Sequence, residues 1–122
     1  MIKLTFCLVR RPEFTRESFQ AYWRDHHGPL VASVKDVLRI RRYVQTHSAA
    51  EELSAPFQAT RGGPPGYDGV AELWWDGWDD LQANGGSEEA RAAGQMLLED
   101  ERKFIDLSKS PLWWGEEHAV IS

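Results

Sequence analysis

The sequence predicts an α+β fold of the ferredoxin-like type, with the element order βαββαβ and a four-stranded antiparallel sheet whose helices cover one face. Two observations carry this prediction. Residues 2–10, 40–47, 67–75 and 112–121 show the side-chain alternation that is typical of strands, and helical spacing of apolar residues follows the first and the third of these segments. The length suits one domain, which we take as residues 1–122.

The helix after the first strand carries the most informative residues of the chain. Thr15 has the side chain of a helix N-cap, and aromatic residues follow it at helical spacing. We expect Gly28-Pro29 to end this helix, with a second short helical piece over residues 30–37. His26 and His27 would then stand at a helix C-terminus, where the macrodipole favours a protonated imidazole. Neighbours on a helix point in different directions, so at most one of them would serve a given site.

The second half of the chain alternates between loop, strand and helix signals. Residues 49–66 are rich in proline and glycine and are expected to form a long exposed loop. A short helix is expected over residues 78–83 after the third strand. A longer helix is expected to begin at Ser87, which can cap it, and to run to Ile105.

One face of the predicted sheet would have no helices on it. The later strands nevertheless carry large aromatic groups on both faces, namely Tyr43, Trp74, Trp75, Trp113 and Trp114. An apolar sheet face of more than a few hundred Å² is rarely left in water. We therefore expect a homodimer in which two sheets face each other and enclose a cavity.

Composition excludes several classes of protein. The net charge of -5 argues against binding to nucleic acid, because that binding needs many Lys and Arg side chains. Cys7 is the single cysteine, so no internal disulfide can form, and a reducing cytoplasm is the expected location. The apolar run over residues 4–9 is too short for a membrane span or a signal peptide core, so we expect no membrane partner. His27, His47 and His118 lack the local spacing of a metal site, so no metal is expected.

Four segments, in this order along the chain, resemble the EthD family. They are Tyr-Trp-Arg-Asp-His-His-Gly-Pro-Leu at 22–30, Arg-Tyr-Val-Gln-Thr-His at 42–47, Tyr-Asp-Gly-Val-Ala-Glu-Leu-Trp at 67–74, and Glu-Asp-Glu with Phe-Ile-Asp within 99–106. The resemblance implies a dimeric α+β barrel. Relatives in that superfamily act as polyketide cyclases, dehydratases, decarboxylases, lactone isomerases and cofactor-free monooxygenases, and what they share is a cavity rather than one reaction.

Four residues are candidates for catalysis. By position, His27 matches the histidine of the family's His-Gly/Ala-Pro-Leu motif, and Glu72 matches the acid of its Asp-Gly-x-x-Glu strand. His27 could instead be a histidine that satisfies a helix carbonyl, and Glu72 could form a structural ion pair with Arg42. Tyr43 and His47 share one face of a strand, where Tyr43 could be a wall residue and His47 could be exposed to solvent.

Four further residues are candidates for contacts with a substrate. Trp23 and Trp74 would pack the interior, a role that coincides with recognition if they line a cavity. Gln45 lies on the same strand as Tyr43, and Cys7 would be a small core or cavity residue.

The leading functional hypothesis is an enzyme without a cofactor that acts on an apolar, aromatic or cyclic, oxygenated small molecule. His27 would be the general base or acid, Glu72 would orient it or act as the complementary acid, and Tyr43 or His47 would bind an oxygen on which negative charge develops. Water elimination, decarboxylation, cyclisation and isomerisation all remain open. The alternative is a non-catalytic binding or accessory protein that uses the same cavity.

Overall fold

A four-stranded antiparallel sheet forms one layer of the molecule. The computed structural model describes residues 1–122, and its strands follow the order β2-β3-β1-β4. Their bounds are Ile2–Leu8 for β1, Arg42–His47 for β2, Gly69–Trp75 for β3 and Leu112–Glu116 for β4. Every neighbouring pair is antiparallel. The predicted ferredoxin-like fold is therefore confirmed.

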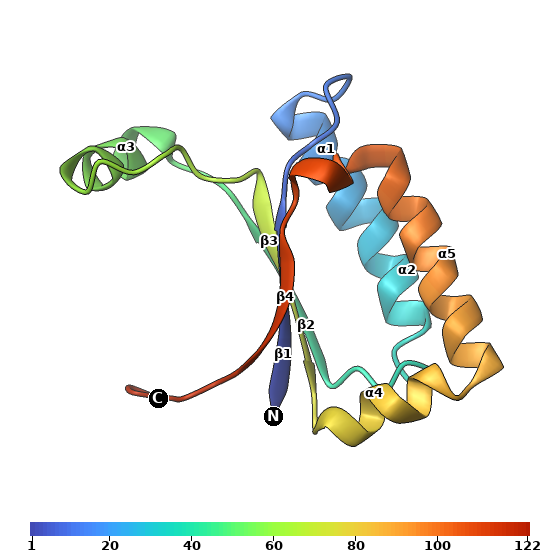
Figure 1. Ribbon diagram of the computed structural model, residues 1–122. Helices are drawn as coiled ribbons and strands as arrows, with labels where there is room; N and C mark the ends of the chain where they lie inside the picture. The colour runs from blue at the N-terminus through green and yellow to red at the C-terminus, as the bar shows by residue number, and fades with distance from the viewer.

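Helices form a second layer on one face of this sheet. This layer contains α1 (Arg16–Tyr22), a π-helical turn (Trp23–His27), α2 (Gly28–Ser33), α4 (Trp78–Gly85) and α5 (Glu88–Phe104). Figure 1 shows α1, α2 and α5 on the same side of the strands. Thr15 caps α1 as expected, since its side chain accepts a hydrogen bond from the Ser18 N–H. The fully buried aromatic side chains Phe19, Trp23 and Phe104 join the helices to the sheet.

Gly28-Pro29 does not end the first helix, contrary to the sequence prediction. The chain continues from α1 through the π-helical turn into α2 and leaves the helix only after Ser33. Pro29 is tolerated because it occupies the first turn of α2, where its missing N–H costs little. His26 and His27 consequently lie inside a continuous helical run, and no helix C-terminus acts on them.

The expected loop over residues 49–66 contains a helix, α3 (Glu51–Thr60). It carries two acidic residues in its first turn, which suit the helix dipole, and Pro56 removes one backbone hydrogen bond from a helix that water reaches on all sides. None of its residues is buried. Figure 1 shows α3 projecting from the molecule on the side of the sheet that lacks the other helices.

The last strand is shorter than predicted and ends at Glu116. Its neighbour β1 begins at Ile2, which pairs with Glu116, so the chain beyond this point has no strand to bond with. Residues 117–122 form a tail in which Val120 and Ile121 are exposed. None of the helices combines the length and the apolar character needed to cross a lipid bilayer.

Candidate functional site

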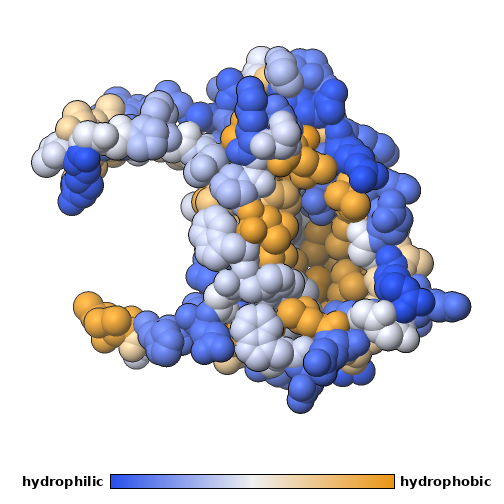
Figure 2. All heavy atoms as spheres, viewed as in Figure 1, coloured by the Kyte–Doolittle hydropathy of each residue, from blue (hydrophilic) through white to orange (hydrophobic).

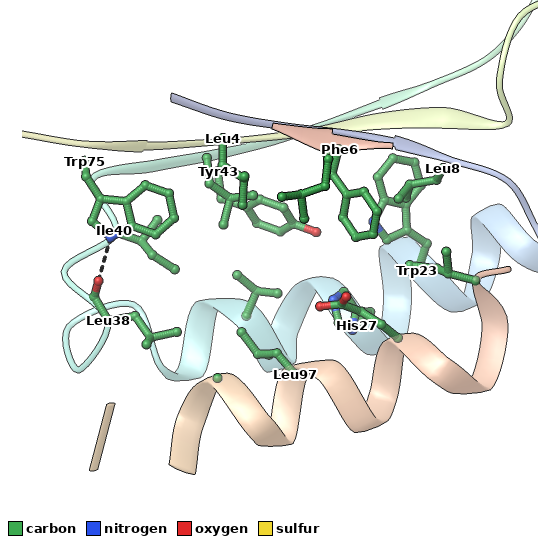
Figure 3. A pocket seen from close by; sticks show the side chains of 17 residues that line it. Leu4, Phe6, Leu8, Trp23, His27, Leu38, Ile40, Tyr43, Trp75 and Leu97 are labelled. Atoms are coloured by element: carbon green, nitrogen blue, oxygen red, sulfur yellow. Dashed lines mark hydrogen bonds between the residues drawn. The ribbon is translucent and has the colours of Figure 1, made fainter. Parts of the chain in front are cut away.

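An apolar cavity lies between the sheet and the helix layer of a single chain. Its volume is about 210 Å³, and 14 of its 17 lining residues are hydrophobic. Figure 2 shows apolar side chains gathered in a hollow between sheet and helices, and Figure 3 shows Leu4, Phe6 and Tyr43 on the sheet side facing His27 and Leu97 on the helix side. The sequence predicts a cavity between the sheets of two subunits, whereas this cavity lies within one chain, where the helices stand far enough from the sheet to leave space.

The π-helical turn brings His27 to this cavity. The N–H of Gly28 donates to the carbonyl of Trp23, five residues back, which inserts an extra residue into the turn. His27 is 5% exposed and lines the cavity, whereas the side chain of His26 is 55% exposed. The two rings differ in exposure, but both approach the same carboxylate, since His26 Nδ1 lies 3.5 Å from Asp100 Oδ2. Turns of this type are frequent at functional sites.

Asp100 on α5 fixes the orientation and protonation of the His27 ring. His27 Nδ1 lies 2.7 Å from Asp100 Oδ2, and the Tyr22 hydroxyl donates to the other carboxylate oxygen at 2.6 Å. Burial alone would raise the pKa of Asp100, but the hydrogen bonds from Tyr22 and His27 outweigh it and lower the pKa. An ionised Asp100 only accepts hydrogen bonds, so Nδ1 of His27 carries the hydrogen.

Burial lowers the pKa of His27, and Asp100 opposes this effect only in part. The ring is therefore neutral at neutral pH. Because Nδ1 carries its hydrogen, Nε2 is the basic nitrogen. This pairing of a buried carboxylate with imidazole is the arrangement that general bases use in many hydrolases.

A chain of hydrogen bonds sets the orientation of the Tyr43 hydroxyl. The side-chain nitrogen of Gln45 donates to the Trp23 carbonyl at 2.9 Å and to the Tyr43 oxygen at 2.8 Å. A carbonyl only accepts, so the Gln45 nitrogen must face it, and the Gln45 oxygen faces His47 Nε2 at 2.7 Å. The hydrogen of the Tyr43 hydroxyl is left free to donate to a ligand. Burial raises the pKa of Tyr43, although the hydrogen bond from Gln45 acts in the opposite direction.

His47 and Gln45 support the cavity without lining it. The His47 ring stacks on Trp23 with centroids 4.4 Å apart, and it borders a separate polar pocket beside α3. Tyr43 and Trp23 do line the cavity. The structure thus brings together five of the eight residues predicted for the site, and three of these, His27, Tyr43 and Trp23, line the cavity.

Glu101 is a cavity residue that the sequence analysis did not select. Its carboxyl group has no hydrogen bond or ion pair, and burial followed by the charge of Asp100 raises its pKa to about 7. The sequence contains a pattern that could have identified Glu101 as a site residue. Glu101 falls in helical register with Leu97 and Phe104 on the apolar face of α5, where a carboxylate is out of place.

These residues form the basis for comparison with known proteins. The model of the EthD domain matches residues 11–108, which hold His27, Tyr43, Asp100 and Glu101. This chain belongs to the EthD family. The resemblance found in the sequence is thus confirmed.

Several solved structures share this fold. An EthD family protein from Bacillus halodurans matches with a TM-score of 0.62 and 21% identity, over 97% of this chain and 100% of that one. An EthD-like protein from Ralstonia eutropha matches with a TM-score of 0.56 and 20% identity, over 98% and 92%. A dimeric protein of unknown function from Bacteroides fragilis matches with a TM-score of 0.58 and 11% identity, over 95% of each chain. No curated protein matches.

In this EthD protein, Glu72 does not reach His27. It lies on the open face of the sheet and accepts a hydrogen bond from Lys3 Nζ at 2.7 Å. The expected pairing of Glu72 with His27 was wrong, because side chains alternate along β3 and it is Ala71 and Leu73 that face the helices. The suggested ion pair with Arg42 is also replaced by the one with Lys3.

Trp74 and Cys7 share the open face with Glu72 and do not line the cavity. Trp74 lies between two cations, with Lys3 Nζ 5.5 Å and the Arg42 guanidinium 4.8 Å from its ring. Cys7 is buried, and burial raises the pKa of its thiol. His118 is exposed in the C-terminal tail. No group of three His, Cys, Asp or Glu side chains is arranged to hold a metal ion.

Proposed function

We propose that this EthD protein is a cofactor-independent enzyme of the lyase or isomerase type, which moves a proton on an apolar, ring-bearing carbonyl compound. The observation that carries the proposal is the buried pair of His27 and Asp100 at an apolar cavity. A neutral imidazole with one nitrogen held by a carboxylate is a competent general base.

The mechanism uses two side chains on opposite walls. Nε2 of His27 removes a proton from the carbon next to the substrate carbonyl. The hydroxyl of Tyr43 donates a hydrogen bond to the carbonyl oxygen as negative charge develops there. Asp100 stabilises the imidazolium that forms. The apolar walls keep water out, which strengthens both electrostatic interactions.

The cavity suits a substrate with a single ring. Its volume of about 210 Å³ exceeds that of an engineered apolar cavity of ~150 Å³ that holds benzene. The ring would lie among the apolar side chains, and the carbonyl group would lie between His27 and Tyr43. Sites of this kind combine an apolar wall with a few polar groups that fix orientation.

The test uses benzylacetone, a ketone with one phenyl ring, as a probe. In heavy water the wild-type protein should exchange the protons next to the carbonyl for deuterium, which proton NMR follows. His27→Ala should lower the exchange rate at least a hundredfold, since positioned acid/base catalysis contributes roughly 10²–10⁴. His118→Ala, which removes an exposed histidine of the C-terminal tail, is the matched control and should exchange at the wild-type rate. Equal rates in wild type and His27→Ala would remove the proposed base.

A binding protein without catalysis is the second candidate, favoured by the predominance of hydrophobic residues in the cavity wall. This function predicts quenching of tryptophan fluorescence by benzylacetone, because Trp23 and Trp75 line the cavity. It also predicts that no deuterium exchange occurs. The two measurements on one sample separate the candidates.

We further infer that the protein is a homodimer in which a second copy covers the open face of the sheet. Trp113 is 49% exposed on that face, beside Thr5 of β1. The Bacteroides fragilis protein of similar fold is described as dimeric. A half-exposed tryptophan on a sheet face without helices supports the inference that a partner buries this face.

A further inference from the structure

The carboxyl group of Glu101 is the one acidic group in the cavity wall. Glu101 lies one helical turn from both Leu97 and Ile105, which line the same cavity. No protein group donates a hydrogen bond to it, and no cation pairs with it. A leucine would pack better at this position, since a partly buried carboxyl group without a partner lowers stability. The group is therefore available to a ligand.

The surroundings of Glu101 raise its pKa into the neutral range, so that a protonated form is present at neutral pH. The titratable groups around it are Asp100 and Arg102 on α5, His27 on the π-helical turn and Tyr43 on β2. Burial and the ionised Asp100 raise its pKa to about 7, and Arg102 opposes this effect only weakly. Glu101 can thus donate a proton in the same cavity in which neutral His27 can accept one.

We propose that Glu101 is the acid that protonates a departing hydroxyl group, so that this site eliminates water from a β-hydroxy ketone. The inference rests on the proposed function, because it needs His27 as base and Tyr43 as donor. It adds the reaction, the substrate class and a third catalytic residue. A base, an acid and a donor for the carbonyl oxygen are the three groups that such an elimination requires.

The bonds balance without any further reactant. Nε2 of His27 takes the proton from the carbon next to the carbonyl, and the electron pair forms an enolate whose oxygen accepts the hydrogen bond from Tyr43. The pair then forms the carbon–carbon double bond while the bond to the β-hydroxyl breaks. The departing oxygen takes the proton of Glu101 and leaves as water. Transfer of the proton from His27 back to Glu101 restores the site, and the net change is one β-hydroxy ketone to one enone and water.

Two probes separate this inference from the proposed function. The first is the β-hydroxy ketone formed from benzaldehyde and acetone, whose elimination product is a conjugated enone that absorbs ultraviolet light. The second is benzylacetone, which lacks the hydroxyl group and reports proton removal alone. Glu101→Gln keeps the shape of the side chain but cannot donate a proton as an acid. Glu99→Gln is the matched control, because Glu99 is exposed on the same helix.

We expect Glu101→Gln to slow the elimination at least a hundredfold while benzylacetone still exchanges its protons within about threefold of the wild-type rate. Glu99→Gln should leave both rates unchanged. In the wild type, elimination should fall above about pH 7, where Glu101 loses its proton, and exchange should not. Elimination by Glu101→Gln at the wild-type rate, an equal loss of both reactions, or a wild type that exchanges but does not eliminate would overturn the role of Glu101. A wild type that does not exchange benzylacetone would overturn the proposed function itself.

Discussion

At the scale of residues, two consecutive carboxyl groups on α5 differ in protonation because they point to different surroundings. Asp100 meets donors from Tyr22 and His27, which lower its pKa. Glu101 meets the apolar cavity, which raises its pKa to about 7. Separation of this kind between neighbouring acids is how one site provides both a charged acceptor and a neutral acid.

The role of Asp100 predicts the outcome of Asp100→Asn. The amide lacks the charge that stabilises the His27 imidazolium, and its nitrogen can donate to Nδ1, which would move the ring hydrogen to Nε2 and block the base. We expect benzylacetone exchange to fall at least tenfold, a loss equivalent to about 1.4 kcal/mol. Nitrogen NMR of the His27 ring should report the change of tautomer. Tyr22→Phe, which removes only the other hydrogen bond to Asp100, should retain the original tautomer, and an unchanged ring in Asp100→Asn would contradict this role.

The pKa of Glu101 predicts how stability varies with pH. Its folded pKa of about 7 lies above the unfolded value of about 4.3, so the folded state holds more protons between these values and becomes less stable as pH rises through this window. Glu101→Gln removes the effect. We expect the variant to match the wild type at pH 4 and to exceed its free energy of unfolding by about 2 kcal/mol at pH 8, a value reduced for the partial exposure of the side chain. Urea unfolding at several pH values measures it, and a constant difference between the proteins would argue against a raised pKa.

The sequence predicts the role of a residue well where a motif fixes its position. It predicts that role poorly where the role depends on which side chains surround the residue in the fold. His27 follows from its place before Gly28-Pro29. Glu72 was assigned to the wrong partner, because the motif does not reveal which face of β3 meets the helices. Asp100 lies in one of the segments that resemble the EthD family, but the sequence does not predict its role, because its contact with His27 joins residues that lie 73 positions apart.

At the scale of elements, α5 forms one wall of the cavity and also carries a glycine that leaves an opening in that wall. Gly94 lies in the middle of α5, lines the cavity and is exposed, so we place it at the cavity mouth. A Cβ atom built at this position has no atom within 4 Å. The glycine therefore lowers helix stability without relieving any steric clash.

Substitution of Gly94 should separate stability from access to the cavity. Gly94→Ala should raise the free energy of unfolding by about 1 kcal/mol, because alanine is the better helix former and the space is open. Gly94→Leu should narrow the mouth and weaken fluorescence quenching by benzylacetone at least tenfold. Ala92→Leu, at an exposed position of α5 that does not line the cavity, should bind like the wild type. Equal binding by Gly94→Leu and Ala92→Leu would mean that the ligand enters elsewhere.

Elements follow from the sequence where packing and local pattern agree. The strands and the helix after Ser87 show strong alternation or an apolar stripe, and each was found. Gly28-Pro29 was misjudged, because proline suits the first turn of a new helix as well as the end of an old one. α3 was missed because none of its residues is buried, so its sequence shows no apolar face that packs against the rest of the chain. Its contact with α1 is polar, an ion pair between Glu51 and Arg16.

At the scale of the whole molecule, α3 and the C-terminal tail project from the open side of the sheet and flank it (Figures 1 and 2). Leu53 and Phe57 of α3 are each 66% exposed, and Val120 and Ile121 of the tail are almost fully exposed. Exposure of these apolar side chains to water is unfavourable, and a partner that covers both projecting segments would remove that cost. These segments extend the surface that a second copy can bury beyond the four strands.

The homodimer predicts that one substitution on the open face separates the subunits but spares the site. Trp113→Asp should shift the protein from dimer to monomer in sedimentation equilibrium, because it places a charge on the sheet face that the partner buries. Trp78→Asp is the matched control, since Trp78 is 46% exposed in the first turn of α4, where an acid is favourable. All cavity residues belong to one chain, so the Trp113→Asp monomer should still bind benzylacetone. A wild type that sediments as a monomer would contradict the dimer, and a monomeric variant without binding would show that the cavity depends on the partner.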